Sequence, residues 1–139
     1  MTTLTELRAK FISGEYTPLQ AVQTALDTIK KKNGEINAFL ATYEDAIAEA
    51  ETATKTYAEG AEVPKLLGMP IAVKNNILVK GKKATGASKI LEDYTAVYDA
   101  TIVQRLKAAG AIIVGATNMD EFAMGGSTEN SAFGPTKNP

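Results

Sequence analysis

An uninterrupted apolar run near the end of the chain, Ala111–Gly115, constrains the fold more than any other sequence feature. A run that is apolar at every position is typical of a strand buried on both faces in a parallel sheet. Before it, the sequence predicts a helix that Asp99 caps and Gly110 ends, with Ile102, Val103, Leu106 and Ala109 facing inward. An earlier segment, Gly68–Val79, predicts another strand. Strand, helix, glycine and strand form a βαβ unit, so the predicted fold class is α/β.

The predicted strand Gly68–Val79 contains a lysine, Lys74, among residues that are mostly apolar and β-branched. Removing an ammonium group from water is costly unless its charge is paired or its proton is lost. Lys74 therefore either reaches water from the end of a strand, which is the commoner case, or belongs to a functional site. Gly81 and a polar turn are expected to interrupt a pair of strands around Lys74.

The N-terminal half predicts amphipathic helices that pack on this sheet. Threonine stands three residues before a glutamate or glutamine at Thr3 and at Thr17, which is the spacing of a capping box. Pro18 suits the first turn of the second helix. The predicted elements are a helix that Gly14 ends, a helix that Asn33-Gly34 ends, a strand over Ile36–Thr42 and an alanine-rich helix over Tyr43–Glu59.

The composition excludes several kinds of chemistry. The chain has no cysteine and no histidine, so it contains no disulfide, no His-ligated metal site and no catalytic dyad or triad with a His base. Acid–base chemistry must come from Lys, Asp, Glu or Tyr. A net charge of −1 gives no electrostatic case for direct nucleic-acid binding. With no signal-peptide pattern and no membrane-length apolar run, the sequence predicts a soluble, cytoplasmic segment.

Two glycine-containing segments bear some likeness to ligand-binding patterns. Gly81 and Gly86 have the outer spacing of a P-loop, but Ala87 stands where that motif requires lysine. The run Met124-Gly125-Gly126-Ser127-Thr128 is small enough for its backbone amides to face a ligand, as in oxyanion sites, although a mobile surface loop is the simpler interpretation. The adjacent acids Asp120 and Glu121 are expected to start a helix.

The last fifteen residues, from Gly125, are polar and rich in turn residues, with little except Phe133 to bury. No later element is available to anchor them. Lys74 could activate a serine nucleophile without histidine, but no Ser-rich glycine loop occurs before Pro139. This pattern predicts that residues 1–139 are the N-terminal part of a single larger domain.

The chain resembles the amidase signature family, and more narrowly its tRNA-dependent amidotransferase branch. The resemblance covers essentially the whole chain, and the block from Gly115 to Pro139 is the most specific to that branch. The segments that carry it are Gly68–Ile77 (GMPIAVKNNI), Ala87–Glu92 (ASKILE), Tyr98–Thr101 (YDAT), Thr117–Gly125 (TNMDEFAMG) and Ser127–Thr136 (STENSAFGPT).

The resemblance implies an α/β/α fold with a mixed central sheet, of which only the N-terminal portion is present, and a Ser–cis-Ser–Lys mechanism acting on the side-chain amide of glutamine. Lys74 falls on the family's catalytic lysine, and both serines would lie beyond Pro139. Met124, Gly125, Gly126 and Ser127 would line the glutamine pocket. The segment itself would need no cofactor and no metal.

In that branch, ammonia passes to a partner subunit that uses ATP and Mg²⁺ to amidate mischarged Glu-tRNA(Gln) or Asp-tRNA(Asn). The resemblance therefore implies a heterotrimer with subunits B and C, tRNA bound through the partner, and no membrane. Three residues depart from the family pattern: Asn75 replaces the usual Asp, Gly86 a common cysteine and Ala116 a common lysine. The neutral Asn75 would favour a protonated Lys74 less than a carboxylate would.

Two other functions remain open from the sequence. A general amidase acting on small amides would use the same Lys74, without a tRNA partner. A non-catalytic module could instead offer its N-terminal helices to a partner subunit. Whatever the function, an exposed sheet edge predicts poor solubility, marginal stability or self-association of the isolated chain.

Overall fold

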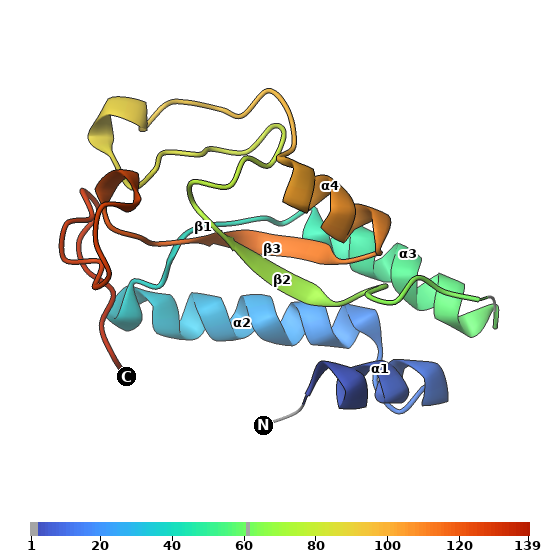
Figure 1. Cartoon of the computed structure of the whole chain (residues 1–139). Helices are drawn as coiled ribbons and strands as arrows, with labels where there is room; N and C mark the ends of the chain where they lie inside the picture. The colour runs from blue at the N-terminus through green and yellow to red at the C-terminus, as the bar shows by residue number, and fades with distance from the viewer. Residues whose placement is uncertain (1–2, 61) are drawn as a thin grey trace.

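The centre of the molecule is a three-stranded sheet in the order β1–β3–β2. The computed structural model describes residues 3–60 and 62–139. The middle strand β3 (Ile112–Thr117) pairs antiparallel with β1 (Phe39–Thr42) and parallel with β2 (Pro70–Lys74). The helices are α1 (Leu4–Ser13), α2 (Pro18–Ile36), α3 (Ala46–Ala58) and α4 (Thr101–Ala108), with short 3₁₀ helices η1 (Lys89–Leu91) and η2 (Glu121–Ala123) (Figure 1). The predicted α/β class with a mixed sheet is confirmed.

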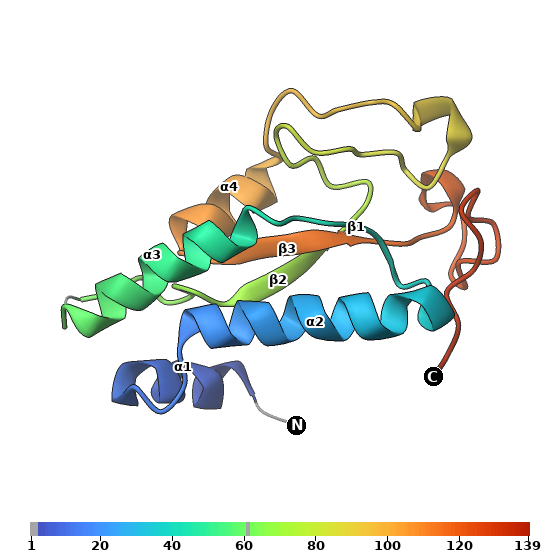
Figure 2. The same cartoon turned by 180° about the vertical axis from the view of Figure 1, so that it is seen from behind.

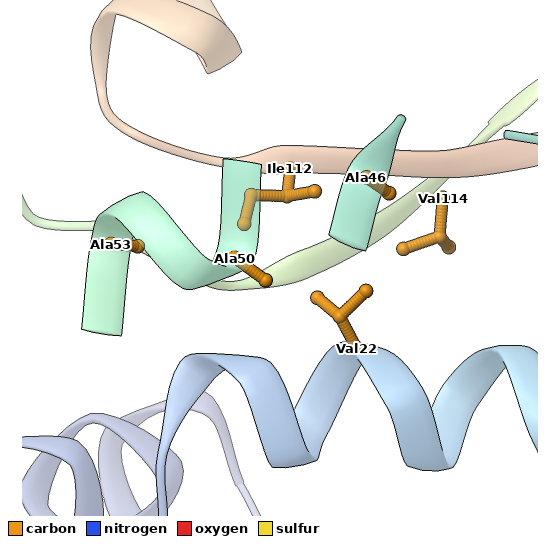
Figure 3. Close-up of a cluster of buried hydrophobic side chains, with 6 residues drawn as sticks. All are labelled: Val22, Ala46, Ala50, Ala53, Ile112 and Val114. Carbon is orange, nitrogen blue, oxygen red and sulfur yellow. The ribbon is translucent and has the colours of Figure 1, made fainter. Parts of the chain in front are cut away.

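Helices cover both faces of this sheet, which gives three layers. Seen from behind, α2 and α3 lie against one side and α4 against the other (Figure 2). The continuous apolar run becomes β3 because alternate side chains must be buried on both faces. Ile113 packs with Val103 of α4. On the opposite face, β3 packs with α2 and with the small residues of α3, in a cluster of Val22, Ala46, Ala50, Ala53, Ile112 and Val114 (Figure 3).

The two N-terminal helices begin where the sequence predicts. Both capping boxes form, at Thr3 with Glu6 and at Thr17 with Gln20. However, Asn33-Gly34 does not end α2, which continues to Ile36. The Asn33 side chain instead bonds to both backbone groups of Phe39, and Asn37 adopts the left-handed conformation that ends the helix.

The predicted strand pair around Lys74 is wrong. Only Pro70–Lys74 is a strand, because the chain turns at once, with the amide of Ile77 donating to the carbonyl of Lys74 at 2.8 Å. β2 is an edge strand, and its Val73 is buried whereas Lys74 is exposed. Of the two alternatives for Lys74, the commoner one is thus observed: it reaches water from the end of a strand.

Two further predictions for the helix before β3 are also corrected. Asp99 does not cap α4; its carboxylate accepts hydrogen bonds from the Lys80 amide at 2.7 Å and from Lys107 Nζ at 2.9 Å. Ile102 points outward, with 54% of its surface exposed, while Val103 is fully buried. The short helix holds one narrow apolar stripe against the sheet, and Ile102 lies outside it.

The polar C-terminal segment is anchored, contrary to expectation. Asn37 Nδ2 donates to the carbonyls of Phe133 and Gly134 at 3.0 and 2.9 Å. Asn118 Nδ2 donates to the same Gly134 carbonyl at 2.8 Å. Residues 124–139 form no helix or strand, and hydrogen bonds from side-chain amides hold this segment in place instead. Within the described ranges, no helix combines the length and apolar character needed to cross a bilayer.

Candidate active site

Lys74 lies at the carboxyl end of β2, where two parallel strands end together. Its register partner on β3 is Thr117, and the amide of Asn75 donates to the Thr117 carbonyl at 3.1 Å. The chain leaves β3 at this same edge and enters the segment that contains Met124–Ser127. In α/β sheets, ligands bind outside the carboxyl ends of the strands. The fold therefore brings Lys74 and the start of the segment after β3 to one edge of the sheet; Figure 1 shows the two strands side by side.

The ammonium group of Lys74 has no partner among the described residues. Five other lysines form ion pairs with carboxylates between 2.7 and 3.1 Å, but Lys74 forms neither an ion pair nor a side-chain hydrogen bond there. Strand alternation places it opposite the buried Val73, on the exposed face. Its side chain is thus available for chemistry.

Asn75 points away from Lys74 and into the protein, with only 2% of its surface exposed. Its Oδ1 accepts hydrogen bonds from the amide and the hydroxyl of Thr85, at 2.9 and 2.5 Å. Its Nδ2 donates to the Lys83 carbonyl at 3.4 Å. Asn75 therefore organises the next loop through buried hydrogen bonds and makes no described side-chain contact with Lys74.

The Thr85–Ser88 segment joins this strand end to residues on both sides of the predicted pocket loop Met124–Ser127. The Gly86 carbonyl accepts from the amide of Phe122 at 2.8 Å, and the Ala87 carbonyl from the amide of Ala132 at 3.0 Å. The buried Ser88 hydroxyl donates to Glu121. Residues 85–88 and residues 121–132, which are far apart in sequence, are thus joined by hydrogen bonds.

Asp120 is a buried carboxylate within this site, and sequence reasoning assigned it only a helix start. Its Oδ2 accepts from the amides of Ser127 and Thr128 at 3.0 and 2.9 Å, and its Oδ1 from the amide of Asn130 at 3.0 Å. The amides of Thr128 and Asn130 hold the pKa of the Asp120 carboxyl below its usual value, against the opposing effect of burial. η2 does follow Asp120, but its carboxylate does not cap that helix.

The loop residues predicted to bind substrate are mostly exposed. Met124 has 74% of its surface exposed, and the Ser127 hydroxyl donates to Glu129 at 2.8 Å. The expectation that the backbone amides of this loop are free is wrong for Ser127 and Thr128, because both donate to Asp120. Among the described residues, the amides of Gly125 and Gly126 donate to no acceptor.

A cavity of about 540 Å³ lies beside this site, between β1 and the loop after β2. Asn75, Thr85 and Lys82 are among its lining residues, but Lys74 is not. The catalytic candidate and this cavity are therefore distinct. No group of three or more His, Cys, Asp or Glu side chains in residues 3–60 and 62–139 is arranged to hold a metal ion.

Comparison with known proteins places this geometry in a family. The family model described as Amidase matches residues 20–139, so the chain belongs to the amidase family. A relative from Alkaliphilus metalliredigens, named as a component of glutamyl-tRNA(Gln) amidotransferase, is 47% identical over 138 residues, which are 99% of this chain and 28% of that protein. The protein of the same name from Renibacterium salmoninarum is 49% identical over 134 residues, 96% of this chain and 26% of its own length. The chain thus spans about a quarter of the length of these relatives.

Solved structures share the same arrangement. One of them comes from a report on an unexpected vestigial protein complex and the evolutionary origins of an s-triazine catabolic enzyme. It matches with a TM-score of 0.93 and 43% sequence identity, and the match covers 100% of this chain and 31% of that chain. The native peptide amidase of Stenotrophomonas maltophilia has a TM-score of 0.87 at 27% identity, and covers 97% of this chain and 29% of that one. The expected amidase-signature fold is confirmed.

Proposed function

We propose that residues 1–139 are the N-terminal part of a single amidase domain, in a glutamine-hydrolysing component of a tRNA-dependent amidotransferase. The observation that carries this proposal is the position of Lys74. It is exposed, it is unpaired within the described chain, and it lies at the sheet edge from which the chain continues into a loop whose Gly125 and Gly126 amides have no described acceptor. The names of the relatives support the amidotransferase branch. The choice of glutamine as the substrate rests on the family resemblance.

In the proposed mechanism, Lys74 acts as the base at the end of a serine relay. A serine hydroxyl beyond Pro139 attacks the carbonyl carbon of the glutamine side-chain amide and passes its proton through a second serine to the free amine of Lys74. The resulting ammonium returns the proton to the leaving nitrogen, which departs as ammonia. Water then hydrolyses the acyl-enzyme to glutamate. The amides of Gly125 and Gly126 would face the bound substrate.

The proposed complex contains subunits B and C as a heterotrimer and works in the cytoplasm. The ammonia would serve a partner subunit that consumes ATP with Mg²⁺ and converts Glu-tRNA(Gln) or Asp-tRNA(Asn) to the amidated form. This chain would supply neither the nucleotide site nor the metal, since its own share of the chemistry is the hydrolysis of glutamine.

The test measures ammonia release from glutamine. In the full-length enzyme, Lys74→Ala should lower the rate by about 1,000-fold or more, because removing a member of a relay disables the nucleophile. Lys80→Ala is the matched control, since Lys80 is also exposed and only its backbone amide makes a described contact. The 139-residue chain alone should release no ammonia. Turnover by that chain, abolished by Lys74→Ala, or near-normal activity of the full-length variant, would refute the proposal.

The likeness to a peptide amidase favours a second candidate, a general amidase acting on small amides. The two differ in substrate and not in the role of Lys74. Ammonia release by the full-length enzyme from glutamine and from simple carboxamides, compared at equal concentration, separates them. Preference for glutamine supports the amidotransferase; preference for simple amides supports the general amidase.

A further inference from the structure

The carboxylate of Asp120 is buried without a cation. Only 3% of this residue is exposed, and no lysine or arginine of the described chain lies within ion-pair distance of it. An unpaired buried charge is costly, so other groups must stabilise it. Three backbone amides do so, those of Ser127, Thr128 and Asn130. Successive amides that converge on one anion form the concave site known as a nest.

The loop closes so tightly on this carboxylate that it admits no side chain at position 125. A Cβ added to Gly125 would lie 2.5 Å from Asp120 Cγ. The neighbouring Gly126 has no atom within 4 Å of the corresponding position. Neither glycine has a positive φ, so the two positions differ only in the space available for a side chain. Glycine at position 125 is therefore required by the contact with Asp120.

The same contact holds a strained backbone. Thr128 has φ 68°, in the left-handed region that is unfavourable for a β-branched residue. Its amide donates to Asp120, and its hydroxyl accepts from the amide of Thr136 at 2.7 Å. Such a conformation persists only where the surroundings impose it. Asp120 thus turns three amides inward and leaves those of Gly125 and Gly126 without a described acceptor.

We propose that Asp120 is the positioning residue of the amide-substrate pocket: its carboxylate fixes the loop from Met124 to Asn130 so that the Gly125 and Gly126 amides face the substrate. The use of these amides by glutamine rests on the proposed function, whereas the loop geometry rests on the contacts above. Asp120 acts through the backbone and touches no reacting atom.

Amide hydrogen exchange of the full-length enzyme tests the loop geometry without any assay of activity. In Asp120→Asn, an amide group replaces one acceptor oxygen, so the amides of Ser127, Thr128 and Asn130 should exchange about tenfold faster or more. Asp93→Asn, at an exposed carboxylate, is the matched control. Exchange of all three amides at the wild-type rate would overturn the proposal.

A steric pair provides a second test that keeps the carboxylate and serves if Asp120→Asn does not fold. Gly125→Ala should accelerate exchange of the same three amides, because its Cβ displaces Asp120. Gly126→Ala should not, because the space beside it is open. Equal behaviour of the two alanine variants would contradict the role of Asp120.

Kinetics of the full-length enzyme distinguish positioning from mere stability. Asp120→Asn should raise KM for glutamine by about tenfold or more and leave kcat within about threefold. A purely structural role would reduce the active fraction, which lowers kcat at unchanged KM, and that result would overturn the proposal. If the wild-type enzyme hydrolyses no glutamine, the proposed function fails and the assignment of a substrate pocket fails with it, while the exchange experiments still decide whether Asp120 shapes the loop.

Discussion

The layered part of the molecule, α1–α4 with β1–β3, and the loop part, residues 75–99 and 118–136, are held together by different forces. In the layered part the core is apolar, with Val22, Ala50 and Val103 completely buried. The buried polar and charged residues of the described chain all lie in the loop part: Asn75, Thr85, Ser88, Asn118, Asp120 and Ser131.

Apolar packing and hydrogen bonding have different effects on the two parts. Apolar packing is non-directional and makes the sheet and helices stable. Hydrogen bonds require particular distances and angles, so they fix backbone that has no regular structure. Asn75, Asn118 and Asp120 each bind backbone groups several residues away. The loops at the carboxyl edge of the sheet are thus positioned by polar side chains.

The largest effect should come from the layered part. Phe11 is 2% exposed and packs with Tyr16 and Tyr57, at ring-centroid distances of 6.4 and 5.7 Å. Phe11→Ala should lower the free energy of unfolding by about 3–5 kcal/mol, because it removes a large buried ring and leaves a cavity. Its neighbour Ile12 is 59% exposed, so Ile12→Ala should change the free energy of unfolding by about 0.5 kcal/mol or less. Urea unfolding followed by circular dichroism measures both, and similar losses would contradict the assigned core.

An intermediate effect should come from the loop part. Asn75→Ala removes the acceptor of two Thr85 hydrogen bonds inside the protein, and an unsatisfied buried donor costs about 1–3 kcal/mol. The adjacent Asn76 is exposed, so Asn76→Ala is the matched control. Urea unfolding gives the change in free energy, and exchange of the Thr85 amide reports the local effect. If Asn75→Ala behaves like Asn76→Ala, the loop does not depend on this side chain.

The smallest effect should appear at the junction of the two parts, where Asp99 joins the loop after β2 to α4. Burial acts to raise the pKa of Asp99, but the hydrogen bonds from the Lys80 amide and from Lys107 outweigh it, so the pKa is lowered. The folded state thus holds the charged form more strongly than the unfolded chain does. Stability from Asp99 is therefore present above the unfolded pKa, about 3.9, and is lost as pH falls through the lower folded value.

Thermal unfolding between about pH 7 and pH 2 tests this contribution, because the range spans both ionisation states of a carboxyl group. Asp99→Asn should have a lower melting temperature than wild type at neutral pH, and the difference in melting temperature should become smaller in acid. Asp93→Asn controls for the loss of one exposed carboxylate. A difference in melting temperature that stays constant over the whole pH range would show that ionisation of Asp99 does not stabilise the fold.

The sequence predicts the layered part well because apolar periodicity and helix caps are local signals. Ala111–Gly115 identified the central strand, and the two capping boxes gave the starts of α1 and α2 correctly. The end of α2 was misplaced because Asn33 uses its side chain on Phe39, a contact that no local pattern reveals. Likewise, Asp99 lies where a helix cap is expected but bonds to Lys80, nineteen residues before it.

The loop part is harder to predict because its determinants are long-range. Lys74 and the start of the glycine loop share one edge of the sheet because β2 pairs parallel with β3, as the predicted βαβ unit implies. No local pattern shows how the loops after these two strands pack on one another. Asp120 was missed as an organiser of that loop. The available signal was an acidic residue a few positions before a Gly-Gly-Ser-Thr turn, a pattern compatible with an anion nest but not specific to it.

The bonds between Asn37 and the C-terminal segment have a consequence for the order of folding. Asn37 binds Phe133, Gly134 and Thr136, which are 96 to 99 residues away. The entropic cost of closing a loop rises with its length, so we expect these bonds to form after the local helices and the sheet. During synthesis, the Asn37 side chain can form these bonds only after residues 133 and 134 have been made. Asn37 therefore has two roles: its backbone ends α2, and its side chain joins this helix to a segment that is made much later.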